Sequence, residues 1–149
     1  MSSWEVYDKF TFNQNSVVIL PWNIGRTHWI VVFINFNTEQ CYIMDQFKPY
    51  DITDRTSKDR FNQVIKKLKS DVSYGDDTHQ CPPLTLIPCP FENVPEQIDV
   101  FNCGVYIIYY AFKFMDNSNF SLEFDPKAYR KYLKTYLLEN FDDMTNVCL

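Results

Sequence analysis

The residue best suited to covalent chemistry is Cys103, in the stretch EQIDVFNCGVYIIYY. Polar residues precede this cysteine, and an apolar run of helical length follows it. A thiol in the first turn of a helix lies beside unpaired N–H groups and the positive end of the helix dipole, which favour the nucleophilic thiolate. The adjacent Gly104 has no side chain, so a substrate backbone could approach the sulfur closely. Cys103 is therefore a candidate nucleophile, and the alternative is an inert buried cysteine.

A histidine and an aspartate stand at the ends of two predicted strands. The runs HWIVVFINF and QCYIMDQF predict strands at 28–36 and 40–47, joined by a turn at 37–38. A turn centred there makes His28 and Asp45 diagonal neighbours, within reach of a hydrogen bond between their side chains. A carboxylate that orients an imidazole is the arrangement in which histidine acts as a general base for a nucleophile. The alternative is a surface histidine and a strand-end aspartate with no joint role.

Gln97 precedes Cys103 by six residues, in the loop that leads into the predicted helix. A side-chain amide N–H beside the sulfur could donate a hydrogen bond to the oxyanion that develops during attack on a carbonyl. Alone, Gln97 is an ordinary loop residue. The three features gain weight when they are taken as one ordered set.

The elements that must position these residues are predicted from hydrophobic patterning. Short apolar runs predict strands at 17–20 and 84–89, with a loop at 21–27 and a polar loop at 71–83. Apolar residues at i, i+3, i+4 and i+7 predict a helix with lysine and arginine on its other face; they are Phe61, Val64, Ile65 and Leu68.

Two further helices are predicted in the last third of the chain. One runs from Cys103 to about residue 115, and the other begins with Asp125 as N-cap and Pro126 in its first turn. The apolar stripe of the last helix consists of Tyr129, Tyr132, Leu133, Tyr136 and Leu137. Strands, a helix, a strand and two helices in this order predict an α+β fold, with a small mixed sheet packed against helices.

Composition limits the classes of function. The length of 149 residues predicts a single domain, 1–149, and the net charge of −5 argues against nucleic acid as a partner. No apolar run approaches the roughly 18 residues of a membrane span, and the first residues lack a signal-peptide pattern, so no membrane is expected. Five cysteines without paired spacing predict free thiols in a reducing compartment, the cytosol or nucleus.

The ordered set resembles the Ulp/SENP family of ubiquitin-like-protein proteases. The matching motifs are HW at His28, MDQF around Asp45, and QIDVFNCGVYI from Gln97 onward. The resemblance implies a papain-like α+β fold, of the ubiquitin-like protease and adenain type, with the nucleophile at the N-terminus of a buried helix. The implied activity is that of a thiol protease, an isopeptidase that cleaves after the C-terminal Gly-Gly of ubiquitin, SUMO or another modifier.

The resemblance also implies residue roles. Cys103 would be the nucleophile, His28 the general base and then acid, and Asp45 the residue that orients the imidazole. Gln97 and the backbone N–H of Cys103 would form the oxyanion hole. Trp29 would cover the narrow tunnel for Gly-Gly; its alternative is a core tryptophan on a buried strand. No cofactor or metal is implied, and a monomer is expected.

Two features depart from the family pattern. The family usually carries Asp directly before the cysteine, where this chain has Asn102. Family domains usually have a helical segment well upstream of the histidine, whereas only 27 residues precede His28 here. The chain is thus expected to be a compact variant, or part of a longer protein that carries this substrate-binding segment.

Four alternatives remain at this stage. A zinc site could be drawn from His79, Cys81 and Cys89, although the usual ligand spacing is missing. An effector-type acyltransferase would use the same residue types but needs a basic site for acyl-CoA. A non-catalytic module that binds a ubiquitin-like protein and a viral-type polyprotein protease are the others. Among modifiers, the acidic charge slightly favours ubiquitin over SUMO.

Overall fold

The fold is an α+β arrangement of a small mixed sheet and three helices, as predicted. The computed structural model describes residues 11–12, 17–47, 55–71, 73–74 and 82–140. Its strands are β1 (Thr11–Phe12), β2 (Val17–Ile24), β3 (His28–Asn35), β4 (Gln40–Met44), β5 (Ser73–Tyr74) and β6 (Thr85–Leu86). Its helices are α1 (Arg55–Asp71), α2 (Cys103–Met115) and α3 (Pro126–Glu139).

The main sheet has the strand order β2-β3-β4-β6. Strands β2, β3 and β4 are antiparallel neighbours, and β6 lies parallel to β4. In the β3–β4 hairpin Val31 pairs with Met44 and Asn35 with Gln40, which is the register predicted from the sequence. The turn is held by Asn35, whose Oδ1 accepts hydrogen bonds from the backbone N–H groups of Asn37 and Thr38.

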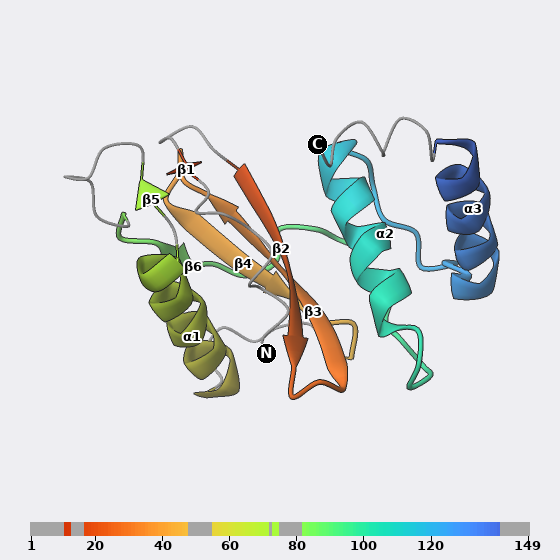
Figure 1. Cartoon of the computed structure of the whole chain (residues 1–149). Coiled ribbons are helices and arrows are strands. Elements are labelled where there is room, and N and C mark those ends of the chain that lie inside the picture. The colour runs from red at the N-terminus through yellow and green to blue at the C-terminus, as the bar shows by residue number, and fades with distance from the viewer. Residues whose placement is uncertain (1–10, 13–16, 48–54, 72, 75–81, 141–149) are drawn as a thin grey trace.

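Strand β3 is central and is covered on both faces, which explains its uninterrupted apolar run. Figure 1 shows α1 on one side of the sheet and α2 on the other, with α3 beyond α2. The side chains of Val31 and Phe33 belong to the core formed with α2, while those of Ile30, Val32 and Ile34 belong to the core formed with α1. From the α1 side, Val64 and Leu68 pack against the sheet, as the helical pattern predicted.

The strand boundaries differ from the prediction in several places, including β4, which ends at Met44 and not at 47. Strand β2 continues through most of the predicted loop to Ile24, because Pro21 is tolerated in an edge strand, where no neighbour needs its missing N–H. The predicted strand 84–89 is reduced to β6. Within the predicted loop 71–83, β5 forms a parallel pair with β1, and 75–81 lie outside the described residues.

The last helix begins as predicted, because the Asp125 side chain accepts a hydrogen bond from the Lys127 N–H and Pro126 opens the helix. Its apolar stripe, however, is not buried. Tyr129 is half-buried against Tyr109, whereas Tyr132 is 51% exposed. No residue of α3 is fully buried, because α3 packs on the outside of α2 (Figure 1).

Candidate active site

His28 and Asp45 meet at one end of the sheet, as the hairpin register predicted. His28 is the first residue of β3, and Asp45 directly follows β4. The distance between His28 Nε2 and Asp45 Oδ1 is 3.0 Å, and both side chains are largely buried. Because a carboxylate can only accept, Nε2 carries the proton of the neutral imidazole. The other nitrogen, Nδ1, then has a free lone pair and can take up a proton.

The carboxylate of Asp45 has two more partners. Its Oδ1 also accepts a hydrogen bond from the backbone N–H of Phe47, at 3.0 Å. Its Oδ2 accepts from Arg60 Nη1 of helix α1, at 3.0 Å. The Phe47 ring in turn stacks on the imidazole of His28, with 4.9 Å between centroids. Together these contacts hold the carboxylate of Asp45 and the ring of His28 in position.

Gln46 packs beneath the histidine. Its side chain is 1% exposed, and its Nε2 donates a 3.0 Å hydrogen bond to the carbonyl of Trp29. The same nitrogen lies 3.5 Å from His28 Nδ1, a weak contact. Because the Trp29 carbonyl oxygen can only accept a hydrogen bond, the nitrogen of the Gln46 amide points toward it. The nitrogen is therefore also the end of this amide that faces the histidine. Gln46 therefore supports the position of His28 and leaves Nδ1 available to a stronger partner.

Cys103 is the first residue of α2, as predicted, and is 9% exposed. In Figure 1 the N-terminal end of α2 lies at the same end of the molecule as the turn from β2 into β3, where His28 begins its strand. The preceding loop is tied to the sheet, since the Gln97 N–H donates to the carbonyl of Gln46 at 2.7 Å. Pairing of the sulfur with the His28 ring stays a prediction.

The loop before α2 is also tied to the helix itself. The Tyr110 hydroxyl donates to the carbonyl of Pro95 at 2.6 Å, and the Tyr106 hydroxyl donates to that of Glu96 at 3.2 Å. Both tyrosine side chains are buried. One rigid unit thus carries Gln97 and Cys103.

Two other cysteines have environments that suppress thiolate formation. Burial raises the pKa of the Cys41 thiol to about 12. Burial also raises the pKa of Cys89, in spite of a backbone hydrogen bond at Phe91 that lowers it. Both are free thiols: Cys41 lies in the core formed with α1, and Cys89 packs against the core formed with α2, which fits structural cysteines.

The amide of Gln97 is buried and points its nitrogen toward Asp99. Nε2 lies 2.7 Å from the Asp99 carbonyl and 2.9 Å from its Oδ1. A single N–H can bridge two acceptors of one residue in a three-centre bond, which leaves the second N–H for another acceptor. Gln97 is thus able to act as an oxyanion donor, but its partner in this structure is Asp99.

Trp29 and Gly104 are both open to a ligand. Trp29 is 36% exposed, which excludes the alternative of a core tryptophan. A Cβ placed on Gly104 would meet no atom within 4 Å apart from its chain neighbours and the adjacent helix backbone. Free space therefore lies beside the residue that follows Cys103.

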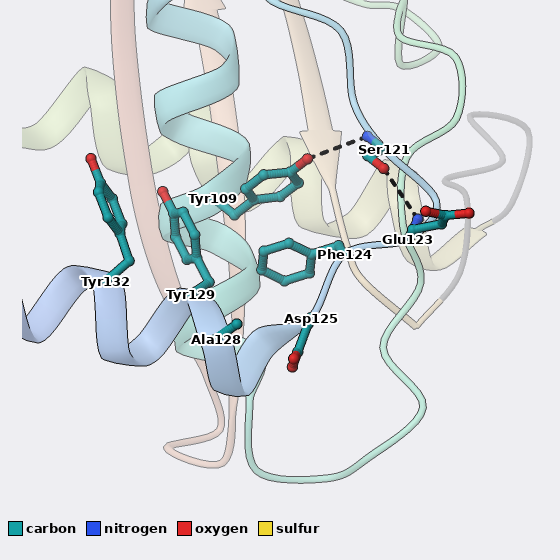
Figure 2. A pocket seen from close by; sticks show the side chains of 8 residues that line it. All are labelled: Tyr109, Ser121, Glu123, Phe124, Asp125, Ala128, Tyr129 and Tyr132. Carbon is teal, nitrogen blue, oxygen red and sulfur yellow. Dashed lines mark hydrogen bonds between the residues drawn. The ribbon is translucent and has the colours of Figure 1, made fainter.

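A separate hollow of about 370 Å³ opens between α2 and α3. Figure 2 shows Tyr129 of α3 between Tyr109 of α2 and Tyr132 of α3, with Phe124 below Tyr109. None of its lining residues is a predicted site residue. Its aromatic rings pack mostly against each other, so we regard it as a groove in the α2–α3 contact.

The described part of the chain contains neither a cluster of metal-binding side chains nor a helix suited to a membrane span. No group of three or more histidine, cysteine or acidic side chains there could hold a metal ion. The zinc alternative used His79 and Cys81, which lie outside the residues that the structure describes. No helix among the described ranges is long and apolar enough to cross a membrane.

Four polar residues of this region were missed by sequence reasoning: Arg60, Gln46, Asp99 and Arg130. Arg60 was assigned to the solvent face of its helix, but it lies four residues before Val64 and eight before Leu68, on the same face. Continuing the apolar stripe one turn toward the N-terminus would have found it. Arg130 had no such signal, because its partner, Asn102, is 28 residues away.

Residues 3–144 match the family model described as the Ulp1 protease family, C-terminal catalytic domain. No individual curated protein matches the chain. The X-ray structure of the C-terminal Ulp1 protease domain in complex with Smt3, the yeast ortholog of SUMO, is similar at TM-score 0.55 and 17% identity.

The match covers 76% of this chain and 46% of that Ulp1 chain, so the sequence spans about half the length of its structural relative. A second structure, SUMO protease Ulp1 with its catalytic cysteine oxidised to a sulfenic acid, has TM-score 0.49 and 17% identity over 76% of this chain and 47% of the other. The first likeness establishes the fold, and the second adds nothing to it.

Proposed function

Because the chain belongs to the Ulp1 protease family, we propose that it is a cysteine peptidase that cleaves after the C-terminal Gly-Gly of a ubiquitin-like modifier. The observation that carries this proposal is the His28–Asp45 hydrogen bond at the end of the sheet. It leaves Nδ1 of the imidazole free at the end of the molecule where α2 begins with Cys103.

In the proposed reaction, Nδ1 of His28 takes the proton of the Cys103 thiol. The thiolate attacks the carbonyl carbon of the terminal glycine and forms a tetrahedral oxyanion. The imidazolium then gives its proton to the leaving amine, the C–N bond breaks, and a thioester remains. Water, deprotonated by His28, hydrolyses the thioester and releases the modifier. Asp45 holds the ring and balances its positive charge throughout.

Gln97 and the Cys103 backbone N–H are the proposed oxyanion donors. Removing one such donor typically lowers kcat by about 10²–10³. Gln97→Ala should therefore reduce kcat with little change in KM. A change confined to KM would mean that Gln97 only contacts the substrate.

Trp29 and Gly104 are proposed to admit the two glycines. A large indole next to the histidine and an open space beside Gly104 suit an extended backbone without side chains. One fluorogenic modifier should thus be cleaved after Gly-Gly and poorly after Ala-Gly or Gly-Ala. Equal turnover of the three would remove the tunnel from the proposal.

The modifier is proposed to be SUMO or ubiquitin. The related Ulp1 domain was crystallised with the yeast SUMO ortholog, which favours SUMO. The net charge of −5 suits encounter with the basic face of ubiquitin, so ubiquitin is the second candidate. Free thiols favour a reducing compartment, such as the cytosol or nucleus, as the proposed location.

The test is covalent labelling with a panel of modifiers that carry a C-terminal electrophile. Wild type should form an adduct with at least one of them, and Cys103→Ala should form none while keeping its unfolding temperature. His28→Ala should lower turnover by at least about 10³, and Asp45→Asn by a smaller factor. Binding without labelling would instead support the non-catalytic module. Labelling of Cys103→Ala would place the nucleophile elsewhere.

A further inference from the structure

Between Gln97 and Cys103 the chain folds around one carboxylate, that of Asp99. Its Oδ1 accepts hydrogen bonds from the backbone N–H groups of Phe101 and Asn102, at 3.0 and 2.9 Å, and from Gln97 Nε2 at 2.9 Å. Its Oδ2 accepts from Asn102 Nδ2 at 2.8 Å. Four donors therefore converge on one side chain that stands between the proposed oxyanion donor and the proposed nucleophile.

Asn102 extends this arrangement to the last helix. Its Oδ1 accepts a 2.6 Å hydrogen bond from Arg130 Nη2 of α3. The residue is 3% exposed and is the N-cap of α2, yet its side chain makes no capping hydrogen bond. Its amide is used instead between two charged groups, with nitrogen toward the carboxylate and oxygen toward the guanidinium.

Hydrophobic packing does not hold this loop. The outward side chains of Ile98, Val100 and Phe101 are 98%, 85% and 68% exposed. An apolar segment that is not anchored by burial needs polar anchors to keep one conformation. Desolvation alone would raise the pKa of the Asp99 carboxyl, but the hydrogen bonds from Asn102, Phe101 and Gln97 outweigh it and lower that pKa to about 2. The anchor is therefore charged at neutral pH.

We propose that Asp99, Asn102 and Arg130 are positioning residues that hold the Gln97 amide and the N-terminus of α2 in their working geometry. This inference rests on the proposed function for its catalytic consequence. The carboxylate of Asp99 can only accept hydrogen bonds, so it selects the nitrogen end of the Gln97 amide and rejects the oxygen end. Asn102 and Arg130 keep that carboxylate from rotating away. The charged groups of Asp99 and Arg130 thus fix which end of each amide donates and which accepts. We call the series of contacts from Gln97 through Asp99 and Asn102 to Arg130 the relay.

The experiment is a polarity exchange between positions 99 and 102. Asp99→Asn replaces the carboxylate oxygen that accepts from Asn102 Nδ2 with an NH₂ group, so that two donors face each other. Asn102→Asp places two carboxylates together. Each single variant should lower kcat about tenfold, with KM nearly unchanged. The double variant Asp99→Asn/Asn102→Asp restores one donor facing one acceptor and gives Arg130 a carboxylate partner. It should recover to within about threefold of wild type.

Arg130→Gln tests the other end of the relay. Lys131→Gln, one residue along the same helix, is the matched control. Loss of Arg130 should lower kcat severalfold, and the control should leave it unchanged. A double variant whose loss equals the product of the two single losses would overturn the relay. So would wild-type kcat in both Asp99→Asn and Arg130→Gln.

The same four-variant cycle is measured by chemical unfolding, which does not depend on activity. A coupling between positions 99 and 102 is expected there as well, and its absence would overturn the relay as a structural unit. If the wild type neither turns over substrate nor reacts with any electrophilic modifier, the proposed function is wrong. The unfolding cycle still tests whether positions 99 and 102 are coupled. If the wild type is active and the cycle shows no coupling, only the relay fails.

Discussion

Arg60 and Asp45 form an ion pair of 3.0 Å that joins helix α1 to the end of strand β4. The other oxygen of the same carboxylate holds His28 from β3. Helix α1 packs on the face of the sheet opposite α2. Asp45 therefore connects His28 to helix α1, which carries none of the other proposed site residues.

Replacing Arg60 with Met should lower kcat about tenfold, because Asp45 loses one of the partners that fix its orientation toward His28. Met is chosen so that its side chain, and not solvent, takes the place of the largely buried guanidinium. Arg55→Gln is the matched control, since the Arg55–Asp59 pair is exposed and surface pairs contribute little. Steady-state turnover of a Gly-Gly substrate decides the matter. Equal activity of both variants would show that Asp45 is held well enough by the strands alone.

Gly104→Ala separates substrate contact from fold. A methyl group at this position meets no atom within 4 Å beyond its chain neighbours and the adjacent helix backbone, and alanine is a better helix former than glycine by up to about 1 kcal/mol. The variant should unfold at the same or a slightly higher temperature but turn over substrate more slowly, because the methyl group occupies the proposed path of the glycine backbone. Unchanged turnover would mean that the substrate does not pass beside Gly104.

Alkylation should distinguish the cysteines. At neutral pH iodoacetamide should modify Cys103 well before Cys41, whose thiol has a pKa raised to about 12 by burial. Peptide mass mapping over time gives the order of modification. His28→Ala should slow modification of Cys103 without affecting Cys41. Modification of Cys41 and Cys103 at one common rate would indicate unfolding before reaction.

Acid should remove the contribution of Asp99 to stability. Its pKa in the folded protein is about 2, below the ordinary value of 3.8, so its contribution is fully present above about pH 4 and is lost as pH falls toward 2. The difference in unfolding free energy between wild type and Asp99→Asn should therefore shrink over that interval. Urea unfolding at pH 6, 4 and 2.5 measures it. A difference that stays constant would mean that the carboxylate is not stabilised by its four donors.

The hairpin and the helix that begins at Cys103 were predictable because local rules determine them. A turn at 37–38 sets the register of the two strands, and that register brings His28 to Asp45. Likewise, a polar loop before an apolar run of helical length predicts where α2 begins. The α+β class followed from the order of these elements.

The contacts between distant elements were not predictable in the same way. The Asp45–Arg60 and Asn102–Arg130 contacts depend on how helices dock, and single-sequence periodicity describes a face without saying what it touches. The stripe of α3 shows the opposite failure, since an apolar pattern predicted burial that the described structure does not provide. Periodicity indicates which side of a helix can be covered, while tertiary packing decides whether it is.

Pro21 has a consequence for how polypeptides can meet this fold. It lies within β2, the edge strand of the main sheet, and removes a backbone donor there. Regular addition of an extended peptide along β2 would therefore lack one ladder hydrogen bond at Pro21. The same gap discourages edge-to-edge association between copies of the chain, which is a hazard for a small sheet with an eight-residue edge. Pro21 thus disfavours strand addition at this edge, whereas His28 stands at the end of the neighbouring strand β3.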